Sequence, residues 1–307
     1  AHLYRRWPRL LPAGMAVVAV ELPGHGSRMG ERPCTDLASL VEGPLAAEVA
    51  GLLDRPLVSF GHSMGAVVGF ELCREIRRRH AAWRPAGFIA AACEAPARLH
   101  TRDYAGRMTD EGMTRFLIDT GGTPAAILEN EQFLALLRPV IRAELGLLRA
   151  RRHRPEPPLD CPTRVYLGAE DQTIDPVKAA PWQDESSADY ATQFFPGGHF
   201  FTQGCESIVV ARLRHDIRRM TGIAGPPASP HICDPRRFDT MRSGTMRSGS
   251  LSPEQKLLLG RLLDKKGIGR DGDAPATAGP APVTGDRSAL PLSFAAAHLV
   301  PQPDAAR

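Results

Sequence analysis

A glycine–x–serine–x–glycine motif at residues 61–65 constrains the fold of this chain more than any other feature of its sequence. The motif follows an apolar segment, 56–60, and precedes an amphipathic segment with helical spacing, 66–79. A serine between a strand and a helix in this pattern lies at a sharp, strained turn that exposes its hydroxyl. The two glycines remove Cβ atoms that would collide with the backbone there. We therefore expect a strand, a tight turn and a helix, with Ser63 as a nucleophile.

The alternative interpretation is a glycine-rich turn with an inert serine, because a pattern of five residues also arises by chance. The strand and the helix expected on either side of the motif argue against this alternative. The N-terminal end of the helix dipole points at Ser63. The backbone N–H of Met64 is then expected to be one donor of an oxyanion hole.

A serine hydroxyl is a poor nucleophile near neutral pH, so the site needs a base and an acid that orients the base. In hydrolases with this turn, the acid and then the histidine follow the serine along the chain, each after a later strand. Residues 163–168 and 190–195 have the pattern of strands; Asp171 follows the first and His199 follows the second. The sequence therefore predicts a catalytic triad of Ser63, Asp171 and His199.

Four other residues are alternatives for the acid and the base. Glu170 is one residue too early to be the acid, and Asp175 precedes a proline, as a helix cap does. His62 is next to the nucleophile, but its side chain is expected to point away across the turn, so we interpret it as structural. His25 is interpreted as a loop residue.

The predicted fold class is α/β. We expect an α/β-hydrolase fold in residues 1–221, with a mostly parallel sheet flanked by helices and an inserted helical lid at 97–158. The near-continuous apolar strands fit burial on both faces of such a sheet. The expected strands are 15–22, 56–60, 87–93, 163–168 and 190–195; the expected helices are 36–54, 66–79 and 206–219 and, in the lid, 109–120 and 129–152.

The lid helix at 129–152 has a broad apolar face. Such a lid restricts water, and we expect its apolar face to close over a tunnel for a long substrate. Packing of this face against the core is the simpler interpretation, and the two are compatible because a lid must also bury one face. After Gly222 the composition becomes that of a linker, 222–250, with a tandem Thr-Met-Arg-Ser-Gly repeat. The remaining tail, 251–307, is expected to be largely disordered apart from one capped helix at 252–266.

Composition argues against several functions. The formal net charge of +4 is modest, so no nucleic-acid binding is expected. The six cysteines lie far apart without the spacing of a metal or redox site, and neither a signal peptide nor an apolar run of transmembrane length is present. We therefore expect a cytoplasmic protein that needs no metal or cofactor and does not contact a membrane.

Six motifs lie within residues 1 to about 221: Leu3–Trp7, Glu21–Gly26 with Arg28, Gly61–Ala66, Gly121–Pro124, Arg154–Pro162 and Gly197–Phe201. They resemble those of the type II thioesterases of polyketide and nonribosomal peptide synthesis. That resemblance implies hydrolysis of stalled or aberrant acyl thioesters from the phosphopantetheine arm of acyl or peptidyl carrier proteins. It also implies the triad roles of Ser63, Asp171 and His199 and the oxyanion N–H of Met64. Separately, we expect a monomer.

The chain departs from this family pattern at both ends. Family members begin with a strand and a loop that supplies the second oxyanion donor, and this sequence starts after them, so an N-terminally truncated fold is expected. The segments 251–256 and 290–295 resemble the linker helix and the opening of a condensation domain, without its catalytic histidine motif.

Three questions stay open from the sequence. The same triad also serves an acyltransferase or a carboxylesterase, and a chain with one oxyanion donor is alternatively a weakly active fragment that docks carrier proteins. The basic clusters at 77–79 and 149–154 are interpreted as solvated helix ends, with carrier docking as the alternative.

Overall fold

The computed structural model describes residues 4–11, 14–222 and 296–301. Within these ranges the strands form one six-stranded sheet in the order β1–β6–β2–β3–β4–β5. Strands β2 to β5 run parallel to one another, and every residue of β2, β3 and β4 is buried, as the near-continuous apolar sequences predict. The strands are β1 (Met15–Ala19), β2 (Val58–His62), β3 (Gly87–Ala91), β4 (Thr163–Gly168), β5 (Tyr190–Phe195) and β6 (Ala296–Pro301).

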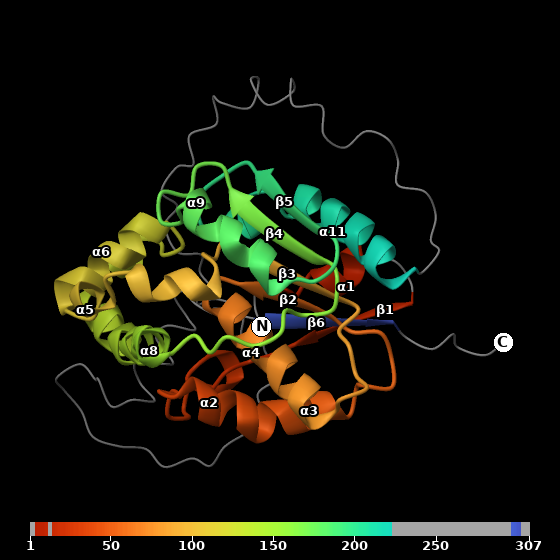
Figure 1. Cartoon of the computed structure of the whole chain (residues 1–307). Helices are drawn as coiled ribbons and strands as arrows, with labels where there is room; N and C mark the ends of the chain where they lie inside the picture. Colours follow the sequence, from red (N-terminus) through yellow and green to blue (C-terminus); the bar gives the residue numbers. More distant parts are fainter. Residues whose placement is uncertain (1–3, 12–13, 223–295, 302–307) are drawn as a thin grey trace, which may run out of the picture.

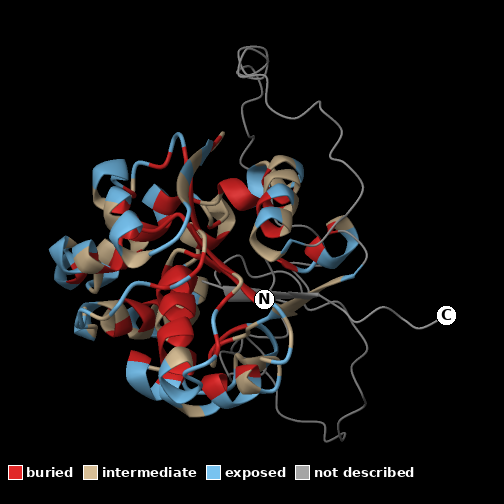
Figure 2. Cartoon of the chain, turned by 45° about the vertical axis from the view of Figure 1, so that its right-hand side comes forward, coloured by how far each residue is buried: buried red, intermediate tan, exposed pale blue. Residues whose placement is uncertain are grey.

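Helices cover both faces of the sheet, so each face has its own hydrophobic core (Figure 1). Trp7, Val209 and Leu213 belong to the smaller core, under α1 (Trp7–Leu10), α10 (Phe201–Gly204) and α11 (Glu206–Thr221). The larger core lies on the other face, under α2 (Leu37–Leu40), η3 (Val41–Leu45), α3 (Ala46–Ala50), α4 (Met64–Arg79), α9 (Pro176–Ala179) and η5 (Ala180–Glu185). Figure 2 shows buried residues along the sheet and exposed residues on the outer sides of the helices. The α/β-hydrolase fold predicted from the sequence is confirmed.

The helix expected at 36–54 is interrupted. Gly43 leaves the helical region at φ −89° and ψ −125°, and Pro44 follows it inside a π-helical segment, η3. Proline has no N–H to donate and disfavours helical geometry in the residue before it, so the two residues together break the helix. The apolar periodicity continues across the break, which is why the pattern alone predicts one helix.

The lid contains the two predicted helices and further short ones. The structure places α6 at Asp110–Thr120 and α8 at Glu131–Ala150, with the short elements η4 (Pro96–Thr101), α5 (Tyr104–Arg107) and α7 (Ala125–Leu128). Outside the lid, the short element η2 (Gly26–Arg28) follows His25. The side chains of Thr109 and Asn130 cap the two long helices, and Gly121 ends α6 in the left-handed conformation. The apolar face of α8 packs against the larger core through Ile141 and Leu145.

Strand β6 was not predicted. It runs antiparallel to both neighbours and separates β1 from β2, with Leu299 opposite Val17 on one side and Val58 on the other. The sequence pattern predicts one helix and no strand in residues 251–307, so β6 is an element that the prediction lacked. Three predicted parts of the tail lie outside the described residues: the linker at 222–250 apart from Gly222, the helix at 252–266 and the condensation-domain-like segments.

A buried polar cluster joins β4 to α11. The Asp216 carboxylate has no exposed surface, accepts a 2.6 Å hydrogen bond from the Tyr166 hydroxyl and pairs with Arg164 and Arg212. A buried carboxylate is tolerated only when its lone pairs are used in this way. Because these partners come from the strand and from the helix, the cluster holds α11 in place on the sheet.

Most arginines of the two basic clusters are exposed near helix ends, as interpreted from the sequence, but several of them also form ion pairs within the chain. Arg77 and Arg78 contact Glu156, and Arg78 and Arg79 also pair with Glu75. Arg151 is almost fully buried and binds Glu71 and the carbonyl of Pro96, so it holds the end of α8 against the body of the protein. These arginines are engaged within the chain.

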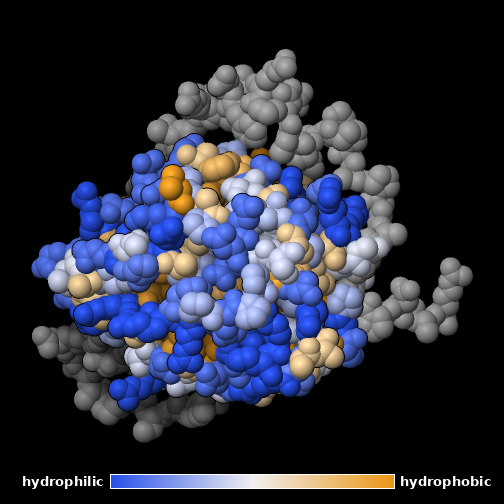
Figure 3. All heavy atoms as spheres, viewed as in Figure 1, coloured by the Kyte–Doolittle hydropathy of each residue, from blue (hydrophilic) through white to orange (hydrophobic). Residues whose placement is uncertain are grey.

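The surface shown in Figure 3 is mostly hydrophilic, with small, separated apolar areas. Among the described residues the large apolar side chains that are exposed are Ile118, Val177 and Phe194. None of the described helices is long and apolar enough to cross a membrane.

Candidate active site

Ser63 lies between β2 and α4 in the strained turn that the motif predicts. Its backbone has φ 53° and ψ −120°, a conformation that residues with a Cβ rarely adopt. A Cβ on Gly61 would lie 2.3 Å from the carbonyl oxygen of Gly65, which explains why the first motif position needs glycine. The Ser63 N–H donates to the carbonyl of Ala91 on β3 at 2.7 Å, and this bond fixes the turn against the sheet.

The structure brings the three predicted triad residues together. The Nε2 atom of His199 lies 3.1 Å from the Ser63 hydroxyl, and its Nδ1 atom lies 2.8 Å from an oxygen of Asp171. His199 and Asp171 are 3% and 8% exposed, whereas Ser63 is partly accessible. With this arrangement the His199 ring can accept the Ser63 proton at Nε2 while its Nδ1–H donates to the Asp171 carboxylate.

The loops after β4 and β5 touch each other, and this contact aligns the acid with the base. A Cβ on Gly168 would lie 2.3 Å from the carbonyl oxygen of Gly198, so the two loops approach this closely only with glycine there. Gly197 turns the second loop with φ 105°. The Glu170 N–H donates to the carbonyl of Gly197, which adds a direct bond between the loops.

The surroundings of the site favour the charged form of Asp171 and the neutral form of His62. Burial raises the pKa of the Asp171 carboxyl, but hydrogen bonds from His199 and Thr173 outweigh burial, so the net shift is downward. Burial lowers the pKa of His62 to about 3, so that ring is neutral at physiological pH. The Nε2 of His62 lies 2.8 Å from the His199 carbonyl oxygen, which gives His62 the structural role predicted for it.

The alternative acids and bases are placed elsewhere. Glu170 is exposed, and the Asp175 side chain accepts from the N–H of Val177 at the start of α9, which confirms the predicted cap. His25 is a loop residue, as predicted, but its side chain is buried and forms a hydrogen bond with a residue of the lid. Its Nε2 atom lies 2.6 Å from the carboxylate of Glu144 on α8.

The contact between His25 and Glu144 links the body of the protein to the lid, and both side chains are more than nine-tenths buried. Burial raises the pKa of the Glu144 carboxyl, and the bond with His25 opposes that shift. Replacing His25 with leucine is expected to lower the free energy of unfolding by about 3 kcal/mol, because a buried carboxyl loses this partner. Urea unfolding measures the change.

The matched control is the variant with His25→Leu and Glu144→Leu together. Its loss of stability is expected to be smaller than the sum of the losses in the two single variants, because the Glu144 carboxyl is then removed together with its partner His25. Additive effects of the two substitutions would show that the contact does not couple lid and body.

Thr173 is a site residue that sequence reasoning missed. Its hydroxyl lies 2.7 Å from Oδ1 of Asp171 and 3.0 Å from Nδ1 of His199, and its N–H donates to the same Asp171 oxygen at 2.8 Å. An aspartate that accepts from the N–H two residues later forms an Asx turn, which is common in loops. The spacing of Asp171 and Thr173 was therefore the available signal, but it does not show that the hydroxyl also reaches His199.

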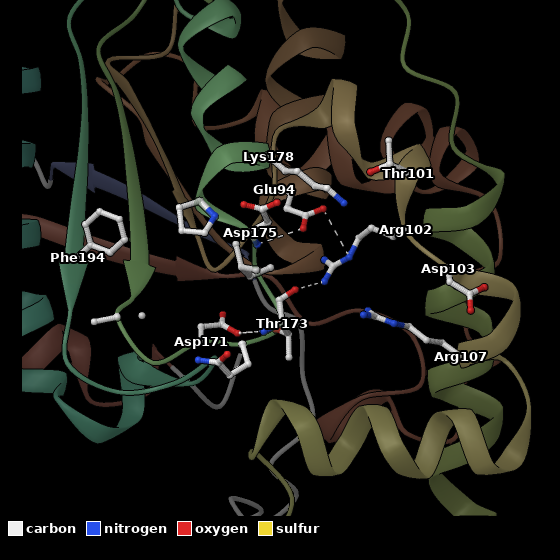
Figure 4. A pocket seen from close by; sticks show the side chains of 15 residues that line it. Glu94, Thr101, Arg102, Asp103, Arg107, Asp171, Thr173, Asp175, Lys178 and Phe194 are labelled. Atoms are coloured by element: carbon white, nitrogen blue, oxygen red, sulfur yellow. Dashed lines mark hydrogen bonds and ion pairs between the residues drawn. The ribbon is translucent and has the colours of Figure 1, made fainter.

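A cavity of about 520 Å³ opens beside the acid, between the β4 loop and the start of the lid (Figure 4). Arg102 and Arg107 approach it from the lid side, and Asp171 and Thr173 form part of the opposite wall. Ser63 is not among the lining residues, so the cavity lies behind the acid and not at the nucleophile. The substrate tunnel under α8 stays a prediction.

Helix α4 begins directly after the nucleophile, with Ser63 at its N-cap position. Met64 is the first residue of that helix, and a first-turn N–H has no acceptor within its own helix. Its role as a donor to an oxygen bound at Ser63 stays a prediction. Within the described residues no cluster of histidine, cysteine, aspartate and glutamate has a metal-binding arrangement.

Comparison with known families identifies this arrangement. Residues 1–217 match the family described as "Thioesterase domain". The chain belongs to the thioesterase family. As a thioesterase it is a hydrolase of the serine type, and the family predicted from its motifs is confirmed.

This thioesterase is similar to a bacterial protein named for linear gramicidin. It is 32% identical over 221 residues to "Linear gramicidin dehydrogenase LgrE" of Brevibacillus parabrevis, covering 71% of this chain and 83% of LgrE. LgrE has the name of a dehydrogenase, whereas the matched family and the similar solved structures are thioesterases.

Two solved structures share the fold of this thioesterase. RedJ, a thioesterase from the prodiginine biosynthetic pathway in Streptomyces coelicolor, is 30% identical with a TM-score of 0.63, covering 70% of this chain and 80% of RedJ. YbtT, a type II thioesterase from the yersiniabactin NRPS/PKS pathway, is 26% identical with a TM-score of 0.55, covering 66% of this chain and 82% of YbtT.

Proposed function

We propose that this thioesterase hydrolyses acyl thioesters held on the phosphopantetheine arm of acyl or peptidyl carrier proteins, and so removes stalled or aberrant chains in polyketide or nonribosomal peptide synthesis. The observation that carries the proposal is the row of Ser63, His199 and Asp171 at 3.1 and 2.8 Å in a chain of the thioesterase family. The pathways of RedJ and YbtT support the choice of substrate.

In the first half of the reaction, the Ser63 hydroxyl attacks the thioester carbonyl carbon and His199 accepts the serine proton at Nε2. The carbonyl oxygen becomes an oxyanion, which the Met64 N–H stabilises. Asp171 stabilises the imidazolium that forms. The carbon–sulfur bond then breaks, His199 returns the proton to the leaving thiolate, and the acyl chain is an ester of Ser63.

In the second half, water takes the place of the thiol. His199 removes a proton from water as the water oxygen attacks the acyl carbon of the ester. The bond between that carbon and the Ser63 oxygen breaks, and the serine regains its proton from His199. The products are a free carboxylic acid and a carrier protein whose thiol is available again.

Hydrolysis of a radiolabelled acyl chain from the carrier protein tests the substrate class. We expect kcat/KM for the acyl-carrier protein to exceed that for a p-nitrophenyl ester of the same acyl chain by at least about tenfold, because remote carrier contacts supply binding energy that is used in the transition state. The free acid is the expected product, measured by liquid chromatography.

The control is the same acyl chain on free pantetheine, which has the thioester but not the carrier protein. A preference for the aryl ester over both thioesters would contradict the proposal and favour a carboxylesterase. Acyl transfer to an added alcohol in place of water would favour an acyltransferase.

A further inference from the structure

Three groups form hydrogen bonds with the carboxylate of Asp171. One oxygen, Oδ2, lies 2.8 Å from His199 Nδ1, and the other, Oδ1, accepts both the N–H and the hydroxyl of Thr173. An ionised carboxylate only accepts hydrogen bonds, so the Thr173 hydroxyl must be the donor in this contact. The acid is therefore fixed at both oxygens, by the base on one side and by Thr173 on the other.

The direction of this bond decides what Thr173 does to His199. Because its hydroxyl proton points to Asp171, the lone pairs of Thr173 Oγ1 are left to face His199 Nδ1 at 3.0 Å. The Nδ1–H is then shared between the carboxylate and the threonine oxygen. Both acceptors favour the proton on Nδ1, and this leaves Nε2 without a proton and able to accept from Ser63.

Thr173 is itself held from the lid side. The guanidinium of Arg102, just after η4, donates to the Thr173 carbonyl oxygen and lies 3.7 Å from the carboxylate of Glu94. Glu94 is 3% exposed and follows β3 in the sheet. Figure 4 shows Arg102 between Glu94 and Thr173, with dashed lines to both. The segment that carries Thr173 is thus tied to the sheet through the first residues of the lid.

We propose that Thr173 is a positioning residue of the triad, whose hydroxyl orients the Asp171 carboxylate and shares the Nδ1 proton of His199. The proposal rests on the catalytic roles proposed above for the triad, but not on the identity of the substrate. The hydrogen bonds described for Thr173 go to Asp171 and His199 and not to Ser63, so its effect reaches the reaction through those two residues.

The test compares Thr173→Val, which keeps the shape and removes the hydroxyl, with Thr173→Ser, which keeps the hydroxyl. The rate of covalent labelling by a fluorophosphonate measures activation of Ser63 whatever the natural substrate is. Valine is expected to slow labelling about tenfold or more, because it removes a hydrogen bond to a charged group. Serine is expected to restore the rate to within about threefold.

Steady-state kinetics gives a second readout. Thr173→Val is expected to lower kcat with KM for the thioester changed by less than about twofold, since the hydroxyl acts on the base and not on substrate binding. A matched control is Thr120→Val, which removes another buried threonine hydroxyl, bonded to the Phe116 carbonyl in α6. This control is expected to label at the rate of the unchanged protein.

Two results would overturn the proposal. One is a labelling rate for Thr173→Val equal to that of the unchanged protein, and the other is a loss in Thr173→Ser as large as in Thr173→Val. Failure of the proposed function has a different signature: the unchanged protein would label rapidly at Ser63 and leave acyl-carrier protein intact.

Discussion

Replacing Ser63 with alanine is expected to lower kcat for thioester hydrolysis by about four orders of magnitude or more, because the attacking atom is lost. The remaining rate would come from binding and from the oxyanion donor, which act without the nucleophile. Substrate binding is expected to change little, since the hydroxyl is small and lies at the reacting carbon only. Release of the carrier thiol, followed with a thiol reagent, measures the effect.

Ser59→Ala is the matched control, because Ser59 lies on the same strand with a fully buried side chain and does not reach the site. It is expected to keep kcat within about threefold of the unchanged protein. Circular dichroism of both variants checks that the strand is still folded. Turnover by Ser63→Ala at more than a few per cent of the original rate would assign the nucleophile to another residue.

The second large effect is expected from β6. A chain ended at Gly222 loses the strand that joins β1 to β2, and both neighbours are left with open edges. The expected loss is several kcal/mol, on the scale of the whole stability of a typical domain, about 5–15 kcal/mol. We expect this shortened chain to unfold at a lower temperature or to aggregate, as measured by calorimetry and light scattering.

A point substitution makes the same test within the full chain. Leu299 has a partner strand on both sides, so its backbone N–H lies opposite the backbone of a neighbouring strand. The substitution Leu299→Pro removes this hydrogen-bond donor. A loss of about 2 kcal/mol is expected, with Leu299→Thr as a control that keeps the N–H. Equal stabilities of the proline and threonine variants would show that β6 does not hold β1 and β2 together.

The triad was predictable because its signals are local. A tight turn needs glycine wherever a Cβ would collide, and the order of serine, acid and base along the chain follows from the fold. The strand patterns before Asp171 and His199 therefore placed both residues at the same edge of the sheet as Ser63. The contact of His199 with both residues agrees with that reasoning.

The features that sequence reasoning missed depend on contacts between distant segments. His25 and Glu144 are 119 residues apart, and nothing near either residue indicates the other. Arg151 lies in an arginine-rich segment that is typical of a solvated helix end. Its side chain is buried because α8 packs against the body of the protein. The short strand β6 lies in a part of the sequence that was predicted to be largely disordered. Its partner strands, β1 and β2, lie more than 200 residues earlier in the chain.

Trapping the acyl-enzyme tests the central claim most directly. The protein is mixed with acyl-carrier protein, quenched with acid within milliseconds to seconds, and digested for mass spectrometry. We predict that the acyl group appears on the peptide that contains Ser63, decays at the rate at which the free acid forms, and is absent in Ser63→Ala. Release of the acid at full rate with no acyl group on Ser63, or with the acyl group on another residue, would contradict the account.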